Sequence, residues 1–81
     1  MTPSSSANDF REQGNQAFKA EHFQEAIDRY TDALKALELS DASKSDFTKC
    51  YSNRAQCYIN LGQYYDAVED ATRGRTSTRE R

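Results

Sequence analysis

A segment of about forty residues occurs twice in this chain of 81 residues, and this duplication constrains the fold more than any other feature. Sliding the sequence by 41 positions places Phe10 on Tyr51, Phe23 on Tyr64 and Ala26 on Ala67. Size and polarity keep their order along the aligned stretch, as expected for a duplicated supersecondary unit. Such units serve as binding scaffolds far more often than as enzymes.

The composition agrees with a small helical domain. A chain this short allows one domain and buries only about 60% of the surface that its unfolded form exposes. It has one Pro and three Gly, and no apolar run approaches the ~18 residues of a membrane helix. The first residues lack the basic start and apolar stretch of a secretory signal, so we expect a disordered lead over residues 1–7 and a cytoplasmic protein. A net charge of -2 with interspersed signs argues against a nucleic-acid binder.

Apolar periodicity predicts four helices in two antiparallel pairs within one domain that spans residues 8–81. The first pair covers about residues 8–40, begins near Asn8 or Asp9, and breaks at the polar residues Glu21 and His22. The second pair covers about residues 47–75 and turns at Gly62 and Gln63. The Ser- and Asp-rich stretch 41–46 has no periodicity and is predicted to be an exposed connection.

Small residues are expected to set the spacing of the helices. Gly14 and Ala26 fall where the first two helices would face each other, so their backbones can approach closely. Cys50 and Cys57 lie two helical turns apart, roughly 10 Å along one axis, which is too far for a disulfide. We interpret both cysteines as packing residues in a reducing compartment.

The motif within each pair resembles the tetratricopeptide repeat, a helix-turn-helix unit of about 34 residues. The positions that carry the resemblance are Gly14, Asn15, Phe18, Phe23, Ala26, Ile27, Tyr30, Ala33 and Leu34, followed by Tyr51, Ala55, Tyr58, Gly62, Tyr64, Ala67, Val68 and Ala71. The chain departs from the pattern at Gly74, which takes a late Ala position, and no proline closes either repeat. The resemblance implies an all-α fold of two tandem repeats with an incomplete third pair or capping helix.

Catalysis has little support in the sequence. His22 has no nucleophile at helical spacing, and the zinc spacings, phosphate-binding glycine loops and nucleophile elbows of known enzymes are not seen. We therefore predict no catalytic residue, no metal site and no cofactor. The acidic residues of the polar faces are interpreted as solvating charges, and two i,i+4 pairs are expected to add slight helix support: Asp28, Asp32, Asp66, Glu69 and Asp70, with the pairs Glu25–Arg29 and Glu69–Arg73.

Arg11 and Asn15 are the sharpest functional signal, because they lie one turn apart and off the stripe of packing residues. A guanidinium and an amide at this spacing can hold a carboxylate together. With Asn53, they are similar to three of the five residues in the carboxylate clamp of tetratricopeptide co-chaperones. That clamp grips the acidic Glu-Glu-Val-Asp tail of cytosolic heat-shock chaperones of the 70 or 90 kDa class.

The same resemblance implies a wider peptide groove, which includes Lys19, Phe18, Gln56 and Ile59. For Phe18, ordinary packing between the first two helices is an equal alternative. Arg54 is expected to support the helix pair rather than to contact a ligand.

The end of the chain carries one further pattern, a capping box from Ser77 to Glu80 that predicts the start of another helix at 77–81. Either the chain is a piece of a longer protein, or a short last helix covers the preceding one. The two remaining clamp cations would belong to a third repeat, unless arginines of the tail replace them. Self-association through an exposed last helix is also expected.

The sequence thus predicts a protein–protein adaptor or co-chaperone that binds an acidic chaperone tail, with neither nucleic acid nor membrane as partner. The alternatives are a tetratricopeptide scaffold that uses its faces for another protein, and the chaperone-targeting module of a larger enzyme.

Overall fold

The computed structural model of the protein describes residues 6–39 and 44–76, and within these ranges the fold is all-α with four helices. They are α1 (Ala7–Lys19), α2 (Phe23–Glu38), α3 (Lys44–Asn60) and α4 (Tyr64–Thr76). In the described part of the chain, no helix is long and apolar enough to cross a membrane.

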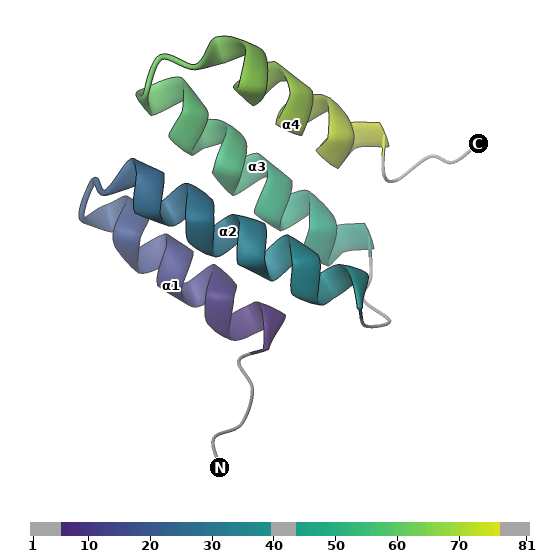
Figure 1. The fold of residues 1–81 in the computed structure, drawn as a ribbon. Helices are drawn as coiled ribbons and strands as arrows, with labels where there is room; N and C mark the ends of the chain where they lie inside the picture. Colours follow the sequence, from purple (N-terminus) through teal and green to yellow (C-terminus); the bar gives the residue numbers. More distant parts are fainter. Residues whose placement is uncertain (1–5, 40–43, 77–81) are drawn as a thin grey trace.

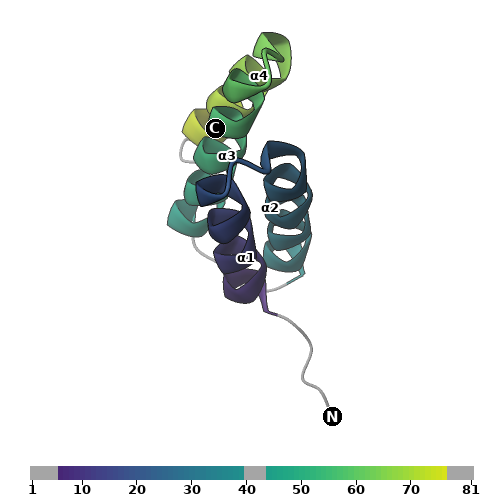
Figure 2. The same ribbon diagram turned by 90° about the vertical axis from the view of Figure 1, so that its left-hand side faces the viewer.

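The four helices lie in sequence order as two antiparallel pairs (Figure 1). α1 packs on α2, α2 on α3 and α3 on α4, whereas α1 touches α3 over only a few residues. In the view turned by 90°, α2 lies to the right of α1 and α3 (Figure 2). The predicted all-α architecture of tandem helix-turn-helix units is therefore confirmed.

The structure shifts two of the predicted helix starts. α1 is capped by Ser6, whose Oγ accepts a hydrogen bond from the Asp9 backbone N–H at 3.2 Å, and Asp9 Oδ2 accepts from Ser6 N at 3.3 Å. This reciprocal capping box places the helix start before Asn8, so that the lead predicted over residues 1–7 is too long. α3 already begins at Lys44, inside the stretch predicted as a connection. The capping box predicted at Ser77 lies outside the described residues.

The two turns within the pairs are built alike, as the duplication predicts. Glu21 has a φ of 65°, and its counterpart Gly62 has a φ of 78°. The backbone N–H of the residue after each of them donates to the carbonyl oxygen five residues earlier. These hydrogen bonds run from His22 N to Ala17 O and from Gln63 N to Tyr58 O, both at 2.8 Å. The first repeat therefore holds a glutamate in the left-handed conformation that glycine adopts at little cost.

Buried residues form two clusters along the helix interfaces. One contains Ala17, Ala26, Ile27, Tyr30 and Cys57, and the other contains Ala33, Leu34, Leu37 and Cys50. Cys50 and Cys57 are free thiols and almost fully buried, which confirms their interpretation as packing residues. Gly14 is needed for the approach of α2, because a Cβ there would lie 2.6 Å from Cε1 of Tyr30.

A buried ion pair joins three helices. Arg54 of α3 donates from Nε to Asp70 Oδ2 at 2.6 Å, from Nη2 to Asp70 Oδ1 at 2.8 Å, and from Nη1 to Thr31 Oγ1 at 2.8 Å. Its guanidinium also lies 5.7 Å from the centre of the Tyr51 ring. The prediction that Arg54 supports the helices is confirmed. Asp70 is only 2% exposed, so its interpretation as a solvating charge was wrong.

One further expectation about side chains fails. Arg29 pairs with Asp32 at 3.1 Å rather than with Glu25, which lies 3.7 Å from the His22 ring. The apolar positions of α4 are largely uncovered: Tyr64 is 63% and Val68 62% exposed, and the adjacent Tyr65 is 92% exposed. Within 64–73, only Ala67 and Asp70 are buried.

Candidate functional site

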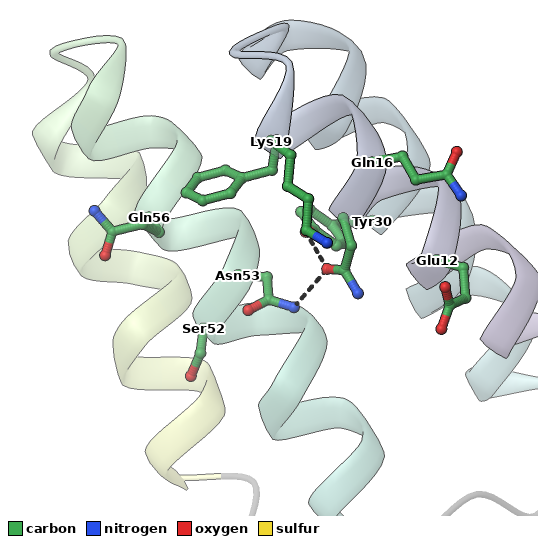
Figure 3. Close-up of a pocket in the computed structure, with 9 residues that line it drawn as sticks. Glu12, Gln16, Lys19, Tyr30, Ser52, Asn53 and Gln56 are labelled. Carbon is green, nitrogen blue, oxygen red and sulfur yellow. Dashed lines mark hydrogen bonds between the residues drawn. The ribbon is translucent and has the colours of Figure 1, made fainter.

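A groove of about 600 Å³ lies between α1 and α3, with one side chain of α2 at its floor. Most of its lining side chains carry amide, hydroxyl or charged groups (Figure 3): Glu12, Asn15, Gln16, Phe18, Lys19, Tyr30, Ser52, Asn53 and Gln56. The α1 residues recur at steps of three and four, which is why they share one face of the helix.

Asn15 is held by hydrogen bonds from two other helices, which converge on its oxygen (Figure 3). The Tyr30 hydroxyl donates to Asn15 Oδ1 at 2.6 Å, and Asn53 Nδ2 donates to the same atom at 3.4 Å. The hydrogen bond from Tyr30 is short, whereas the hydrogen bond from Asn53 is long and therefore weak. The Asn15 oxygen is therefore engaged as an acceptor on the side of Tyr30 and Asn53. The two hydrogens on Asn15 Nδ2 stay available to donate to a ligand in the groove.

Tyr30 keeps its proton over the whole physiological pH range. Burial raises the pKa of Tyr30 to about 12, and the nearby thiols of Cys57 and Cys50 also raise it, while the charge of Arg11 lowers it. A phenol with this pKa is a hydrogen-bond donor wherever the protein is folded. The hydroxyl of Tyr30 can therefore donate to Asn15 Oδ1 throughout this pH range.

The groove offers many donors but little net charge. Lys19 and Glu12 carry opposite charges, and both are exposed on α1. Gln16, Gln56 and Ser52 add neutral groups that can donate or accept. Such a lining can exchange hydrogen bonds with both donors and acceptors of a ligand while adding little net charge.

The structure brings together five of the seven residues that the sequence analysis singled out: Asn15, Asn53, Lys19, Phe18 and Gln56 line the groove. The rings of Phe18 and Phe23 meet edge-on, with their centroids 5.4 Å apart. Phe18 also packs against the buried cluster that contains Tyr30, so it contributes both to the helix packing and to the groove lining. Ile59 is 44% exposed and does not line the groove.

Arg11 also lies outside the lining. Its Nη2 donates to Asn8 Oδ1 at 2.8 Å, and that contact stays on the surface of α1. Its charge nevertheless acts on the buried Tyr30 and Cys50: burial raises the pKa of both groups, and the positive charge of Arg11 offsets part of that rise. Arg11 therefore acts electrostatically on the groove residue Tyr30 without lining the groove itself.

Sequence reasoning missed four lining residues, namely Glu12, Gln16, Tyr30 and Ser52. Glu12 and Gln16 could have been found by extending the helical spacing from Asn15 and Lys19. Tyr30 could not, because it counts as one more apolar position in the stripe of α2. Within the described ranges, no three His, Cys, Asp or Glu side chains cluster as metal ligands would.

Comparison with known proteins gives short matches. No family model and no solved structure matches the chain. It is 43% identical over 67 residues, 83% of this chain, to translocon at the outer membrane of chloroplasts 64 from Pisum sativum. Over 65 residues, 80% of this chain, it is 42% identical to Hsp70-Hsp90 organizing protein 1 from Glycine max. Over 74 residues, 91% of this chain, it is 35% identical to the Hsp70/Hsp90 co-chaperone CNS1 from Saccharomyces cerevisiae.

The chain spans 10%, 10% and 18% of the lengths of these three relatives. The similarity therefore concerns one module of larger proteins. The repeated motif, the two antiparallel helix pairs and these similarities together support tandem tetratricopeptide repeats in this chain.

Proposed function

We propose that this protein is a non-enzymatic adaptor that binds the acidic C-terminal tail of a heat-shock chaperone in the groove between α1 and α3. The observation that carries the proposal is the convergence of Asn15, Asn53 and Lys19, which presents three nitrogen donors on one surface. Two of the relatives support the choice of partner, since their names describe Hsp70 and Hsp90 organisation or co-chaperone activity.

The terminal carboxylate of the tail is expected at the amides. Asn15 has its oxygen engaged by Tyr30 and Asn53, which leaves its Nδ2 to donate to an anion. Lys19, one helical turn further on, supplies a charge for an acidic side chain. Hydrogen bonds to a charged group contribute about 1.5 to 3 kcal/mol each, so a few of them give measurable affinity to a short peptide.

Arg11 takes part, in this proposal, by turning from Asn8 toward the peptide. The guanidinium has five N–H donors, so that one surface hydrogen bond to Asn8 leaves the others available. Its present position already places positive charge near Tyr30. Turning and ordering this long side chain costs about 0.5 to 1.5 kcal/mol, less than the roughly 1.5 to 3 kcal/mol of a hydrogen bond to a charged group.

The decisive measurement compares two peptides that end in Glu-Glu-Val-Asp, one with a free carboxylate and one amidated, by calorimetric titration of the 81-residue protein. We expect the free acid to bind at least tenfold more tightly, and its affinity to fall with salt because the contacts are partly exposed. Equal affinity for the two peptides would remove the carboxylate from the proposal.

Asn15→Asp tests the site within the groove. The aspartate keeps an oxygen for Tyr30 to donate to, but replaces the donor that faces the groove with a second oxygen. Gln16→Glu is the matched control, because it adds the same charge to the same lining. We expect Asn15→Asp to weaken the free-acid peptide by one to two orders of magnitude and Gln16→Glu by far less. Equal losses would mean that only diffuse charge matters.

Arg11→Ala and Lys44→Ala form a second matched pair, since each removes one positive charge from the start of a helix. Lys44 is exposed at the first position of α3 and does not line the groove. We expect only Arg11→Ala to weaken the peptide. Comparable losses in the two variants would exclude a specific role for Arg11.

The second candidate function is a scaffold that binds another protein through the outer face of α4. The exposed Tyr64, Tyr65 and Val68 favour it. Pull-down with the Tyr65→Ser and Asn15→Asp variants separates the candidates, because each variant should abolish only the interaction of its own face. Self-association, a cytoplasmic location and a targeting role within a larger enzyme stay predictions.

A further inference from the structure

We propose that Tyr30 is a positioning residue of the groove: its hydroxyl locks the Asn15 amide with the oxygen inward and the Nδ2 donor facing the ligand. The inference deepens the proposed function and rests on it for the identity of the ligand. The lock itself is a property of the free protein.

The lock depends on a close approach of α2 to α1. Gly14 offers no side chain, and the Tyr30 ring occupies the space where a Cβ would be, with Cε1 at 2.6 Å and Cδ1 at 2.7 Å from that position. The ring is thereby held against the α1 backbone, one residue before Asn15. Tyr30 is only 1% exposed, so its hydroxyl has little access to water and needs a partner in the protein.

The two donors around Asn15 Oδ1 disfavour the flipped amide. In the flipped orientation, Asn15 Nδ2 would face Nδ2 of Asn53 and the Tyr30 hydroxyl. Asn53 has only hydrogens on that atom, so two amino groups would confront each other. Tyr30 would have to turn its hydrogen away from Asn15, and its burial gives that hydrogen little access to water. The inward oxygen is consequently the favoured state, and its strength comes mainly from the 2.6 Å bond to Tyr30.

An anion site needs its donors oriented before the ligand arrives, because a donor that must be turned on binding costs affinity. A free Asn amide would present its oxygen to the anion for part of the time, and that orientation is repulsive. Tyr30 thus affects binding without touching the peptide terminus. Its loss should reduce the preference for the free carboxylate, which a purely structural tyrosine would not change.

The experiment uses Tyr30→Phe, which removes one oxygen and keeps the ring. Tyr58→Phe is the matched control, because Tyr58 packs against the same buried cluster but does not line the groove. Circular dichroism verifies that both variants fold. The Asn15 side-chain amide signals, assigned by their loss in Asn15→Asp, are recorded for the free proteins by 15N NMR. We expect them to shift in Tyr30→Phe and to stay in place in Tyr58→Phe.

Peptide titration supplies the second readout. We expect Tyr30→Phe to bind the free-acid peptide about three- to tenfold more weakly and the amidated peptide as the wild type does. Unchanged Asn15 amide signals in Tyr30→Phe would overturn the lock, whatever the peptide does. Shifted signals with an unchanged ratio of acid to amide affinity would overturn its link to binding. If the wild type does not distinguish the peptides, the proposed function fails, and the NMR comparison still decides on the lock.

Discussion

Replacing Asp70 by Asn should strongly destabilise the fold, because it breaks a buried ion pair. Arg54 and Asp70 are joined by two hydrogen bonds of 2.6 and 2.8 Å, with side-chain exposures of only 12% and 3%. Solvent therefore screens the pair little. In Asp70→Asn an amino group faces a guanidinium N–H, and the buried cation loses its counter-charge. Breaking a buried ion pair costs about 3 to 5 kcal/mol, equivalent to at least about 12 °C in Tm for a domain of this size.

The assay is urea denaturation followed by circular dichroism, with Asp66→Asn as the control. Asp66 lies one turn earlier on α4 and is exposed, so the same loss of charge there should change the midpoint little. The double variant Arg54→Met with Asp70→Leu should recover most of the stability, because it removes the buried charge instead of leaving it unpaired. If Asp70→Asn and Asp66→Asn have the same midpoint, the reasoning about the three-helix contact is refuted.

Three further outcomes are expected. Glu21→Gly should raise the free energy of unfolding by about 0.5 to 1 kcal/mol, because it relieves a φ of 65°, and an unchanged urea midpoint would contradict this. Stability should fall between pH 9 and 12, since burial raises the pKa of Cys57 to about 11 and of Tyr30 to about 12, and the unfolded chain loses these protons first; a flat series of midpoints would disprove it. Glu12→Gln should tighten the acidic peptide about two- to threefold in titration, and the exposed Glu25→Gln should not.

Much of the candidate site follows from helical spacing. Asn15, Phe18 and Lys19 lie at steps of three and four on α1, so their common face could be predicted without a structure. The same spacing places Arg11 one turn before Asn15, but the Arg11 guanidinium bonds to Asn8 instead of lining the groove. Sequence spacing determines where a Cα lies on a helix. The rotamer of a long side chain such as arginine depends on the neighbouring groups, which the spacing does not give.

The sequence by itself determined the four helices, their pairing and the matched turns at Glu21 and Gly62. These features depend on period and polarity, which are local along the chain, and the duplication repeats them at a shift of 41. Only the tertiary structure decided that Tyr30 bonds to Asn15, that Arg54 reaches Asp70, and that Tyr65 stays uncovered. Which polar groups meet depends on how the packed helices are rotated and offset against one another, and that geometry results from the shapes of all the side chains between them.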